Sequence, residues 1–381
     1  MYTGRLVTAG VFFAMFLFAV AVTSLSPALP AIAAEFGAGL GRLGLIFTSN
    51  FLGFCAALSF SGCFSGRIPK SRFFVAGGLG LGLALAAMSA VPGLNFAYAA
   101  IFFVGGFGGL VESIGSAVAA DLNPGRVGPA LNLAQVFFAL GALAGPMLTS
   151  AFIARGISWR LMYLGTGAVT LALFLPFLFA RFPDPPEERF SWPALRGLAR
   201  DGWFLGVLLV MAAYVGVEIG LWGWLATYLG RDLGFSVVRS GWAVSLFWLA
   251  MTAGRGVCSA LLRRVPASRV LIGLTTLGLA ATVPLVLPAA RLPIWPIVVL
   301  LGLGLSGIWP TIVAYGSARH PGHRVLVFSA IVASGGLGGL VVPALVGALA
   351  EAAGFRSGLF LLVLLQAAML GGLVLLGRRR A

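Results

Sequence analysis

Apolar stretches long enough to cross a lipid bilayer recur from one end of the chain to the other. Between short polar gaps the sequence offers windows of roughly 20 residues, the length that a helix needs to cross about 30 Å of hydrocarbon. Only 9% of the 381 residues are Asp, Glu, Lys or Arg, against the roughly 25% that is usual in soluble domains. A water-soluble fold is therefore excluded, because the chain has too few polar side chains to cover its surface.

The sequence predicts an all-α membrane protein with twelve transmembrane helices. Its 54 glycines and 20 prolines agree with this interpretation, because both residues are more frequent in membrane helices than in soluble ones. The expected spans are Leu6–Ala34, Leu43–Ser65, Phe73–Val91, Phe96–Ala120, Val127–Ala154, Trp159–Ala180, Trp203–Leu229, Ser240–Leu262, Val270–Ala290, Ile294–Ala318, Val325–Ala350 and Ser357–Gly377.

Basic residues are distributed unevenly over the two sides of the expected bundle. If the N-terminus is inside, 17 of the 25 Lys and Arg residues lie on the cytoplasmic side and 7 on the other, with Arg255 inside a helix. The positive-inside rule then places both termini in the cytoplasm. The net charge of +15 is spread over short gaps and forms no basic domain for nucleic acid. We expect a monomeric, multi-pass protein of the cell (inner) membrane, surrounded by the lipid bilayer.

Cysteines and histidines form no metal-binding or redox motif. Cys55, Cys63 and Cys258 fall inside apolar runs, where a thiol behaves as a small hydrophobic group, and His320 and His323 share one short polar gap. No CxxC or Cys/His ligand spacing is present. We expect no metal and no cofactor. Because no histidine lies in the membrane and no nucleophile and base come together, we also expect no enzymatic activity.

The chain divides into two similar halves. A proline-rich and charged segment supplies the longest gap, which predicts an N-terminal half over 1–180, a cytoplasmic linker over 181–202 and a C-terminal half over 203–381. Six helices in each half, an even number, make the two repeats parallel, an organisation found in transporters that work by alternating access. Several residues recur at a spacing of 197: Arg67 and Arg264, Arg72 and Arg269, Gly105 and Gly302, Pro124 and Pro321, Gly125 and Gly322, Gly141 and Gly338, and Pro146 and Pro343.

Three ionisable residues lie well inside expected spans, namely Glu112, Glu218 and Arg255. A charge near the bilayer centre is costly, so such residues are candidates for function. A glutamate in a medium of low dielectric constant can hold a proton and release it when water or a cation arrives, which a proton-coupled carrier needs. The alternative for both glutamates is a structural carboxylate in a helix interface. For Arg255 we favour structural pairing or gating.

Amide and aromatic side chains are the candidates for substrate contact. Asn132 and Gln135 lie three positions apart on one face of the fifth helix, where amides either bridge helices or bind substrate hydroxyls. Tryptophan can stack on a sugar ring but also belongs to membrane interfaces. Trp309 is the best candidate among four tryptophans, because it is 197 residues from Glu112. The other three are Trp222, Trp224 and Trp248.

These strings resemble the fucose:proton symporter branch of the major facilitator superfamily, which includes bacterial fucose and glucose/galactose permeases. The resemblance covers most of the chain and implies a sugar substrate and coupling to protons. It is carried by Gly105, Gly106, Gly109 and Glu112 in the fourth helix, Asn132, Ala134, Gln135, Gly141, Gly145 and Pro146 in the fifth, Tyr214, Gly216, Glu218 and Trp224 in the seventh, Gly254 and Arg255 in the eighth, and Pro310 and Thr311 in the tenth.

The sequence departs from this family at three places. The first helix offers Thr23, Ser24 and Ser26 where the family has an aspartate, and Phe138 stands where a second asparagine is expected. The loop between the second and third helices, which contains Arg67, lacks the usual aspartate. A less polar substrate than a sugar would agree with Phe138. The incomplete loop leaves gating to arginines, which we assign to Arg67, Arg255 and Arg264.

We therefore predict a secondary active transporter that moves a small molecule, a sugar or polyol, by alternating access coupled to protons. The alternative is a proton-coupled exporter of amphipathic compounds, because Gly141, Gly145 and Pro146 partly match the fifth-helix element of drug:proton antiporters. A membrane sensor without transport is a remote alternative. We assign proton coupling to Glu112 and Glu218, and substrate binding to Asn132, Gln135, Phe138, Tyr214, Trp224 and Trp309.

Overall fold

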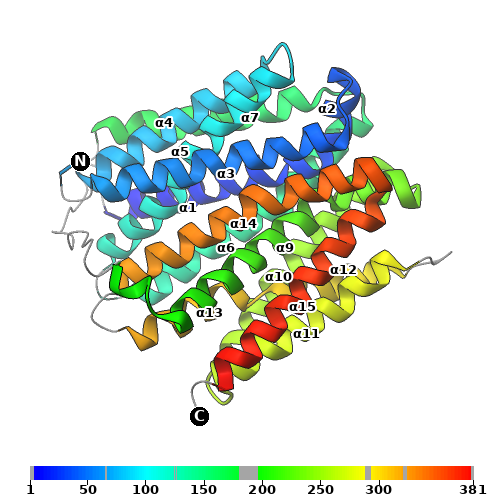
Figure 1. Cartoon of the computed structure of the whole chain (residues 1–381). Helices are drawn as coiled ribbons and strands as arrows, with labels where there is room; N and C mark the ends of the chain where they lie inside the picture. Colours follow the sequence, from blue (N-terminus) through cyan, green and yellow to red (C-terminus); the bar gives the residue numbers. More distant parts are fainter. Residues whose placement is uncertain are drawn as a thin grey trace. The chain divides into compact units, whose positions relative to one another are not determined.

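The described part of the chain consists of helices joined by short connections, with no strand (Figure 1). The computed structural model describes residues 4–64, 67–123, 125, 127–179, 196–287, 293–320 and 324–378. The helices are α1 (Gly4–Thr23), α2 (Leu25–Phe36), α3 (Leu40–Cys63), α4 (Lys70–Ser89), α5 (Leu94–Leu122), α6 (Val127–Ala154), α7 (Trp159–Phe174), η1 (Leu175–Phe179), α9 (Gly202–Leu233), α10 (Val237–Leu261), α11 (Ala267–Val286), α12 (Ile294–Leu305), α13 (Ile308–Arg319), α14 (Arg324–Ala353) and α15 (Phe355–Arg378).

These helices confirm the predicted all-α membrane class. Among the described residues, eleven segments are long and apolar enough to cross a membrane, and the bent pair α1 and α2 raises the number to twelve. One of the eleven is Ile294–Arg319, which contains both α12 and α13. The expected linker over 181–202 lies outside the described residues up to 195, and the division of the chain at this segment stays a prediction.

The first span is bent, whereas the sequence analysis expected one helix over Leu6–Ala34. The axes of its two helical parts meet at 41°. Pro27 has no amide hydrogen for the carbonyl of Thr23, four residues earlier, and its ring crowds that carbonyl, so the helix breaks there. The hydroxyls of Thr23 and Ser24 donate to the carbonyls of Ala19 and Val20 at 2.8 Å and 2.6 Å, a bonding pattern that bends helices further.

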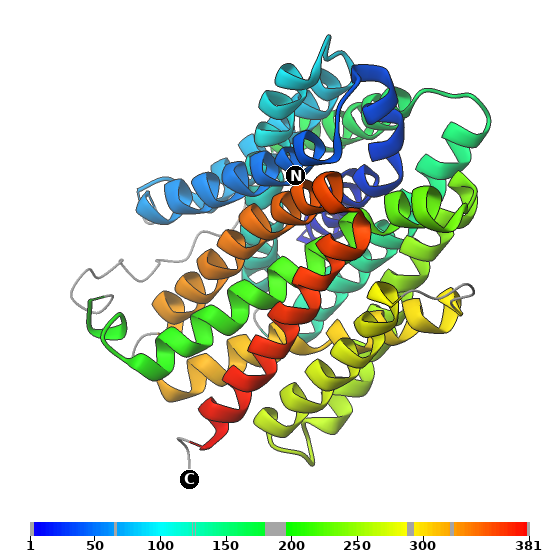
Figure 2. The same ribbon diagram turned by 45° about the vertical axis from the view of Figure 1, so that its right-hand side comes forward.

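The helices form two compact units, and each is described by itself. Unit 1 comprises residues 1–38, 49–189 and 235–245, and unit 2 comprises 39–48, 190–234 and 246–381. In unit 1, α4 packs on α5 and α7, and α1 packs on α6. In unit 2, α9 packs on α14 and α15, and α11 packs on α12 and α15 (Figure 2).

Glycines allow equivalent helices to approach closely in both units. A Cβ atom at Gly105 of α5 would collide with the carbonyl oxygen of Asn50 on α3. In unit 2, a Cβ atom at Gly302 of α12 would collide with the carbonyl oxygen of Phe247 on α10. Both the glycines and their partners are 197 residues apart, so the spacing found in the sequence is also a spacing of contacts. Small residues of this kind let helix backbones meet in membranes.

The same spacing relates two hydrogen bonds near the starts of α3 and α10. In unit 2, the hydroxyl of Thr48 donates to the carbonyl of Leu340 at 2.6 Å. In unit 1, the hydroxyl of Ser245 donates to the carbonyl of Leu143 at 2.8 Å. The two donors are 197 residues apart, and so are the two acceptors. The repeat therefore extends from residue types to individual hydrogen bonds.

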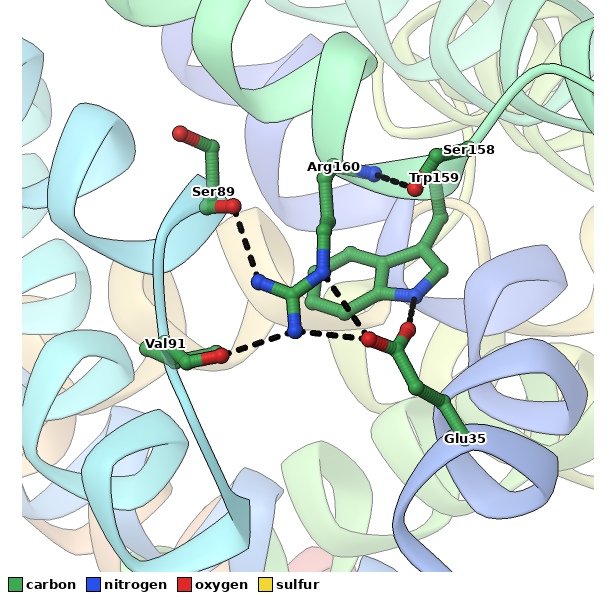
Figure 3. A network of polar contacts seen from close by, with 6 residues as sticks. All are labelled: Glu35, Ser89, Val91, Ser158, Trp159 and Arg160. Carbon is green, nitrogen blue, oxygen red and sulfur yellow. Dashed lines mark hydrogen bonds and ion pairs between the residues drawn. The ribbon is translucent and has the colours of Figure 1, made fainter.

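A polar network ties the end of α2 to the start of α7 in unit 1 (Figure 3). The guanidinium of Arg160 donates to the Glu35 carboxylate at 2.7 Å and 3.0 Å, and to the carbonyls of Ser89 and Val91 at 2.9 Å and 2.7 Å. The indole of Trp159 donates to the other Glu35 oxygen at 2.7 Å, and the Arg160 guanidinium lies over its ring. A fork of donors holds three chain segments at once, which a lysine cannot do.

The glycine contact in unit 1 makes a testable prediction. Gly105→Ala should lower the stability of the protein by about 1–3 kcal/mol, because α5 must move away from α3 to admit the new methyl group. Unfolding measured in detergent should show this loss. Gly165→Ala is the control, because a Cβ atom there meets nothing within 4 Å. Equal stability of the two variants would show that the approach of α3 and α5 is not limiting.

Candidate functional site

The span Ile294–Arg319 contains a helix break in its middle. Pro310 cannot donate to the carbonyl of Ser306, four residues earlier, and its ring crowds that carbonyl. Helix α12 therefore ends at Leu305 and α13 begins at Ile308. The sequence analysis expected an uninterrupted helix over Ile294–Ala318. The structure has a single span there, but this span consists of two helices. Irregular backbone at membrane depth must find hydrogen-bond partners inside the protein.

Side chains of two other helices supply those partners. The phenol of Tyr214, on α9, donates to the carbonyl of Leu305 at 3.1 Å. The Nε of Arg255, on α10, donates to the carbonyl of Ser306 at 3.3 Å, and one of its terminal nitrogens lies 3.8 Å from the sulfur of Met251. The break thus explains why an arginine is retained inside a membrane helix.

Glu218 completes this cluster in unit 2. It follows Tyr214 by one turn of α9 and lies within electrostatic reach of both Tyr214 and Arg255. Tyr214 is fully buried, whereas Glu218 and Arg255 are partly exposed. The structure therefore brings together one residue predicted to couple protons, one predicted to bind substrate and one predicted to gate. We call these three residues and Ser306 the break cluster.

The beginning of α13 is held in place by short polar contacts. The hydroxyl of Thr311 donates to the carbonyl of Gly307 at 2.6 Å, and the sulfur of Cys258 lies 3.7 Å from that hydroxyl. A Cβ atom at Gly307 would collide with the Cys258 side chain. Glycine is therefore required at this position for α10 to pack against the break.

The two tryptophans assigned to substrate occupy different environments. Trp224 has no exposed surface, packs between the rings of Phe47 and Phe355, and donates from its indole nitrogen to the carbonyl of Pro343 at 2.9 Å. Trp309 is partly exposed, and its ring meets that of Phe328 edge to face at 6.2 Å. Trp309 therefore has surface available for a ligand, and Trp224 serves packing in this conformation.

The other predicted proton site, Glu112, lies on α5 in unit 1 with a partly exposed side chain. Its backbone carbonyl accepts a hydrogen bond from the hydroxyl of Ser116 at 2.7 Å. Four residues earlier on the same helix, a Cβ atom at Gly108 would collide with the ring of Phe18 on α1. Phe18 in turn meets Phe138 of α6 edge to face at 6.2 Å, so aromatic rings from α1 and α6 lie beside this part of α5.

Asn132 and Gln135 lie on α6 of unit 1. Asn132 is exposed and Gln135 is partly exposed, so both amides have surface for a ligand. Their helix face continues towards Pro146 and Ser150, where the start of α10 packs: a Cβ atom at Gly241 would collide with Ser150. The amides thus lie on the continuation of a face that is covered by α10 further along the helix.

The remaining gating candidates lie at helix ends. Arg67 follows α3 and Arg264 follows α10, and both are exposed. Their backbone amides donate to the carbonyls of Phe64 and Leu261 at 3.0 Å and 2.9 Å. Arg255 is separated from them, because it lies six residues inside the end of α10.

Sequence reasoning missed two buried polar residues of unit 2. The amide of Gln366 on α15 and the hydroxyl of Thr275 on α11 are each 1% exposed, and neither has a hydrogen-bond partner among the described residues. It also missed the carbonyl of Ser306 as a functional group. Pro310, four residues later, was the signal in the sequence that could have identified it.

Side chains that bind metals do not gather in the described residues. No three His, Cys, Asp or Glu side chains there come close enough to hold an ion. The chemistry that the break cluster can perform is therefore hydrogen bonding and proton binding, together with attraction of a negative charge.

A repeated set of membrane-spanning helices, with one span broken beside an acidic and a basic residue, is the architecture of a secondary transporter. The model of the Major Facilitator Superfamily matches residues 11–325. The chain belongs to this family, and it is a multi-pass membrane transporter and not an enzyme.

Relatives and solved structures agree with this assignment. The protein is 26% identical to the TsgA homolog of Erwinia tasmaniensis over 340 residues, which cover 86% of this chain and 84% of the relative. A bacterial homolog of the human lysosomal transporter Spinster shares the fold with a TM-score of 0.80 at 14% identity, covering 98% of this chain and 97% of the other. The fucose:proton symporter FucP of Escherichia coli has a TM-score of 0.68 at 19% identity, covering 98% and 99%.

Two buried tyrosines provide a matched test of the break cluster. Tyr214→Phe should lower stability by about 1–3 kcal/mol, because the carbonyl of Leu305 then lacks its donor. Tyr163→Phe should be neutral or stabilising, because the Tyr163 hydroxyl is buried and has no partner among the described residues. Unfolding in mixed detergent micelles measures both. If Tyr214→Phe is as stable as Tyr163→Phe, the bond to α12 does not support the break.

Proposed function

We propose that this transporter moves a small polar molecule, a sugar or polyol, by alternating access driven by a proton gradient. The single observation that carries the proposal is the pair of glutamates inside membrane helices, Glu112 in unit 1 and Glu218 in unit 2. Such residues mark proton relays when they are found at membrane depth. The likeness to the fucose:proton symporter FucP supports the choice of a sugar. A nucleoside transporter, NupG, is also among the structures with the same fold, with a TM-score of 0.78.

Topology and assembly are part of the proposal. The excess of basic residues in one set of loops supports an inner-membrane protein with both termini in the cytoplasm. We further propose a monomer with a six-helix half over 1–180, a linker over 181–202 and a second half over 203–381. Arg67 and Arg264 are the proposed gating residues, because they are exposed and lie at equivalent helix ends.

The second candidate function is export of amphipathic compounds, and Phe138 is the observation that favours it. Its ring packs against Phe18 at 6.2 Å, which makes this part of unit 1 apolar. A sugar needs hydrogen-bond partners for its hydroxyls, whereas an amphipathic compound can use aromatic surface. Substitution at this position therefore distinguishes the two functions.

Replacement of Glu112 tests proton coupling. Glu112→Gln should leave substrate exchange intact and abolish accumulation driven by a pH gradient, because the amide cannot take up and release a proton. Uptake by proteoliposomes with and without a pH gradient measures both activities. Asp232→Asn, at the exposed end of α9, is the control and should behave as the wild type. Accumulation that survives in Glu112→Gln would assign coupling to another residue.

Replacement of Gln135 tests substrate contact. Gln135→Ala should weaken substrate affinity roughly tenfold, because a substrate hydroxyl then loses its hydrogen-bond partner. Asn95→Ala, at the exposed start of α5, is the control. Phe138→Asn should strengthen binding of a sugar and weaken binding of an amphipathic compound. Affinity within twofold of wild type in folded Gln135→Ala would make this amide structural.

A further inference from the structure

The break cluster contains an acidic residue, Glu218, and a basic residue, Arg255, that lie apart from the other charged residues of unit 2. In the described helices of this unit, Glu218 and Arg255 are the only Asp, Glu, Lys or Arg residues more than three positions from a helix end. The helices α13, α14 and α15 also pack on α9, and their charged residues lie at helix ends. The ring of Tyr315 of α13 contacts that of Trp203, near the start of α9, at a tilt of 44°. The groups that act on Glu218 are therefore Tyr214 of its own helix and Arg255 of α10.

The charge of this pair depends on one proton. When Glu218 is ionised, its negative charge balances Arg255 and the pair is neutral. When Glu218 carries a proton, Arg255 retains a positive charge that water cannot fully screen at membrane depth. An arginine keeps its own proton in proteins. The protonated state of the cluster therefore requires a negative charge from elsewhere.

The guanidinium has donors left to bind that charge. Its Nε donates to the Ser306 carbonyl, and its contact with Met251 uses a weak sulfur acceptor at 3.8 Å. The other terminal nitrogen makes no hydrogen bond to a described residue, and the side chain is partly exposed. Guanidinium groups bind carboxylates through two parallel hydrogen bonds. The fixed bond to Ser306 orients this fork before a ligand arrives.

Tyr214 links the proton to the helix break. Its phenol has one hydrogen, which it donates to the Leu305 carbonyl. A protonated Glu218 can donate to the phenol oxygen and leave that bond intact. An ionised Glu218 can only accept, so it draws the phenol hydrogen away from Leu305. The protonated state is therefore the one in which both the break and Glu218 are satisfied.

We propose that the break cluster binds the carboxylate of an organic acid, and that the substrate is a sugar acid carried together with one proton. Arg255 binds the carboxylate while Glu218 holds the proton, so one negative and one positive charge enter together and leave together. The inference rests on the proposed proton-coupled transport of a sugar-like molecule. It narrows the substrate from neutral sugars to hydroxylated monocarboxylates and makes Arg255 the residue that selects the acid.

Matched pairs of substrates test this assignment in proteoliposomes. Glucose and glucuronate, and galactose and galacturonate, differ only by oxidation at one carbon, so the pairs isolate the carboxylate. With an inward proton gradient, wild-type protein should take up the uronates at least roughly tenfold faster than the neutral sugars. Transport of neutral sugars without uronates would overturn the inference and leave the proposed function intact. Transport of neither class, in folded protein, would overturn both.

Variants of the cluster extend the test. Arg255→Gln should abolish uronate binding, Arg255→Lys should restore part of it, and Arg269→Gln, at the exposed start of α11, should bind as wild type. Binding of glucuronate to wild type should weaken as the pH rises and Glu218 loses its proton, and Glu218→Gln should remove this dependence. Unchanged uronate affinity in folded Arg255→Gln, or pH-independent binding to wild type, would overturn the assignment.

Discussion

A proline inside a membrane helix leaves a backbone carbonyl that needs a hydrogen-bond donor from elsewhere in the chain. Each such residue leaves a carbonyl four positions earlier without its amide donor, and no water is present in hydrocarbon to replace it. At Pro27 the chain bends by 41°, and the hydroxyls of Thr23 and Ser24 bind carbonyls one turn earlier in the same helix. At Pro310 the answer comes from other helices, through Tyr214 and Arg255. In unit 2, Arg255 thus lies where the broken helix needs a donor.

Much of this fold could be predicted from hydropathy and spacing, because both depend only on the order of residue types along the chain. The twelve windows, the all-α class and the acids inside helices follow from that reading, and Gly105 and Gly302 occupy equivalent contacts, as their spacing indicates. The helix break at Ser306 was not predicted, because hydropathy averages over a window and does not register one missing amide hydrogen. The packing role of Trp224 could not be predicted either, because a tryptophan has the same sequence signal whether it faces a ligand or packs between Phe47 and Phe355.

The two repeats share packing contacts but differ in their ionisable residues. Thr48 and Ser245 have kept the same bond to carbonyls of Leu340 and Leu143, so the contacts that shape each unit are preserved across the duplication. The ionisable residues are not preserved between the repeats, because Glu112 corresponds in position to Trp309. Each unit therefore presents a different set of functional groups on a similar frame. A duplicated fold can in this way carry an acidic residue in one unit at the position where the other unit carries an aromatic one.

The close contacts at glycines determine where the membrane helices can bend. Where α5 meets α3 at Gly105, and α12 meets α10 at Gly302, backbone rests on backbone with no side chain between them. Such contacts cannot be relieved by rotating a side chain, so each pair is mechanically stiff. In the described spans, the α-helical hydrogen-bond pattern is interrupted after Thr23, after Leu305 and, where α7 passes into η1, after Phe174. Bending of the spans is therefore easiest at such interruptions, and the one after Leu305 is where Arg255 of α10 donates to the Ser306 carbonyl.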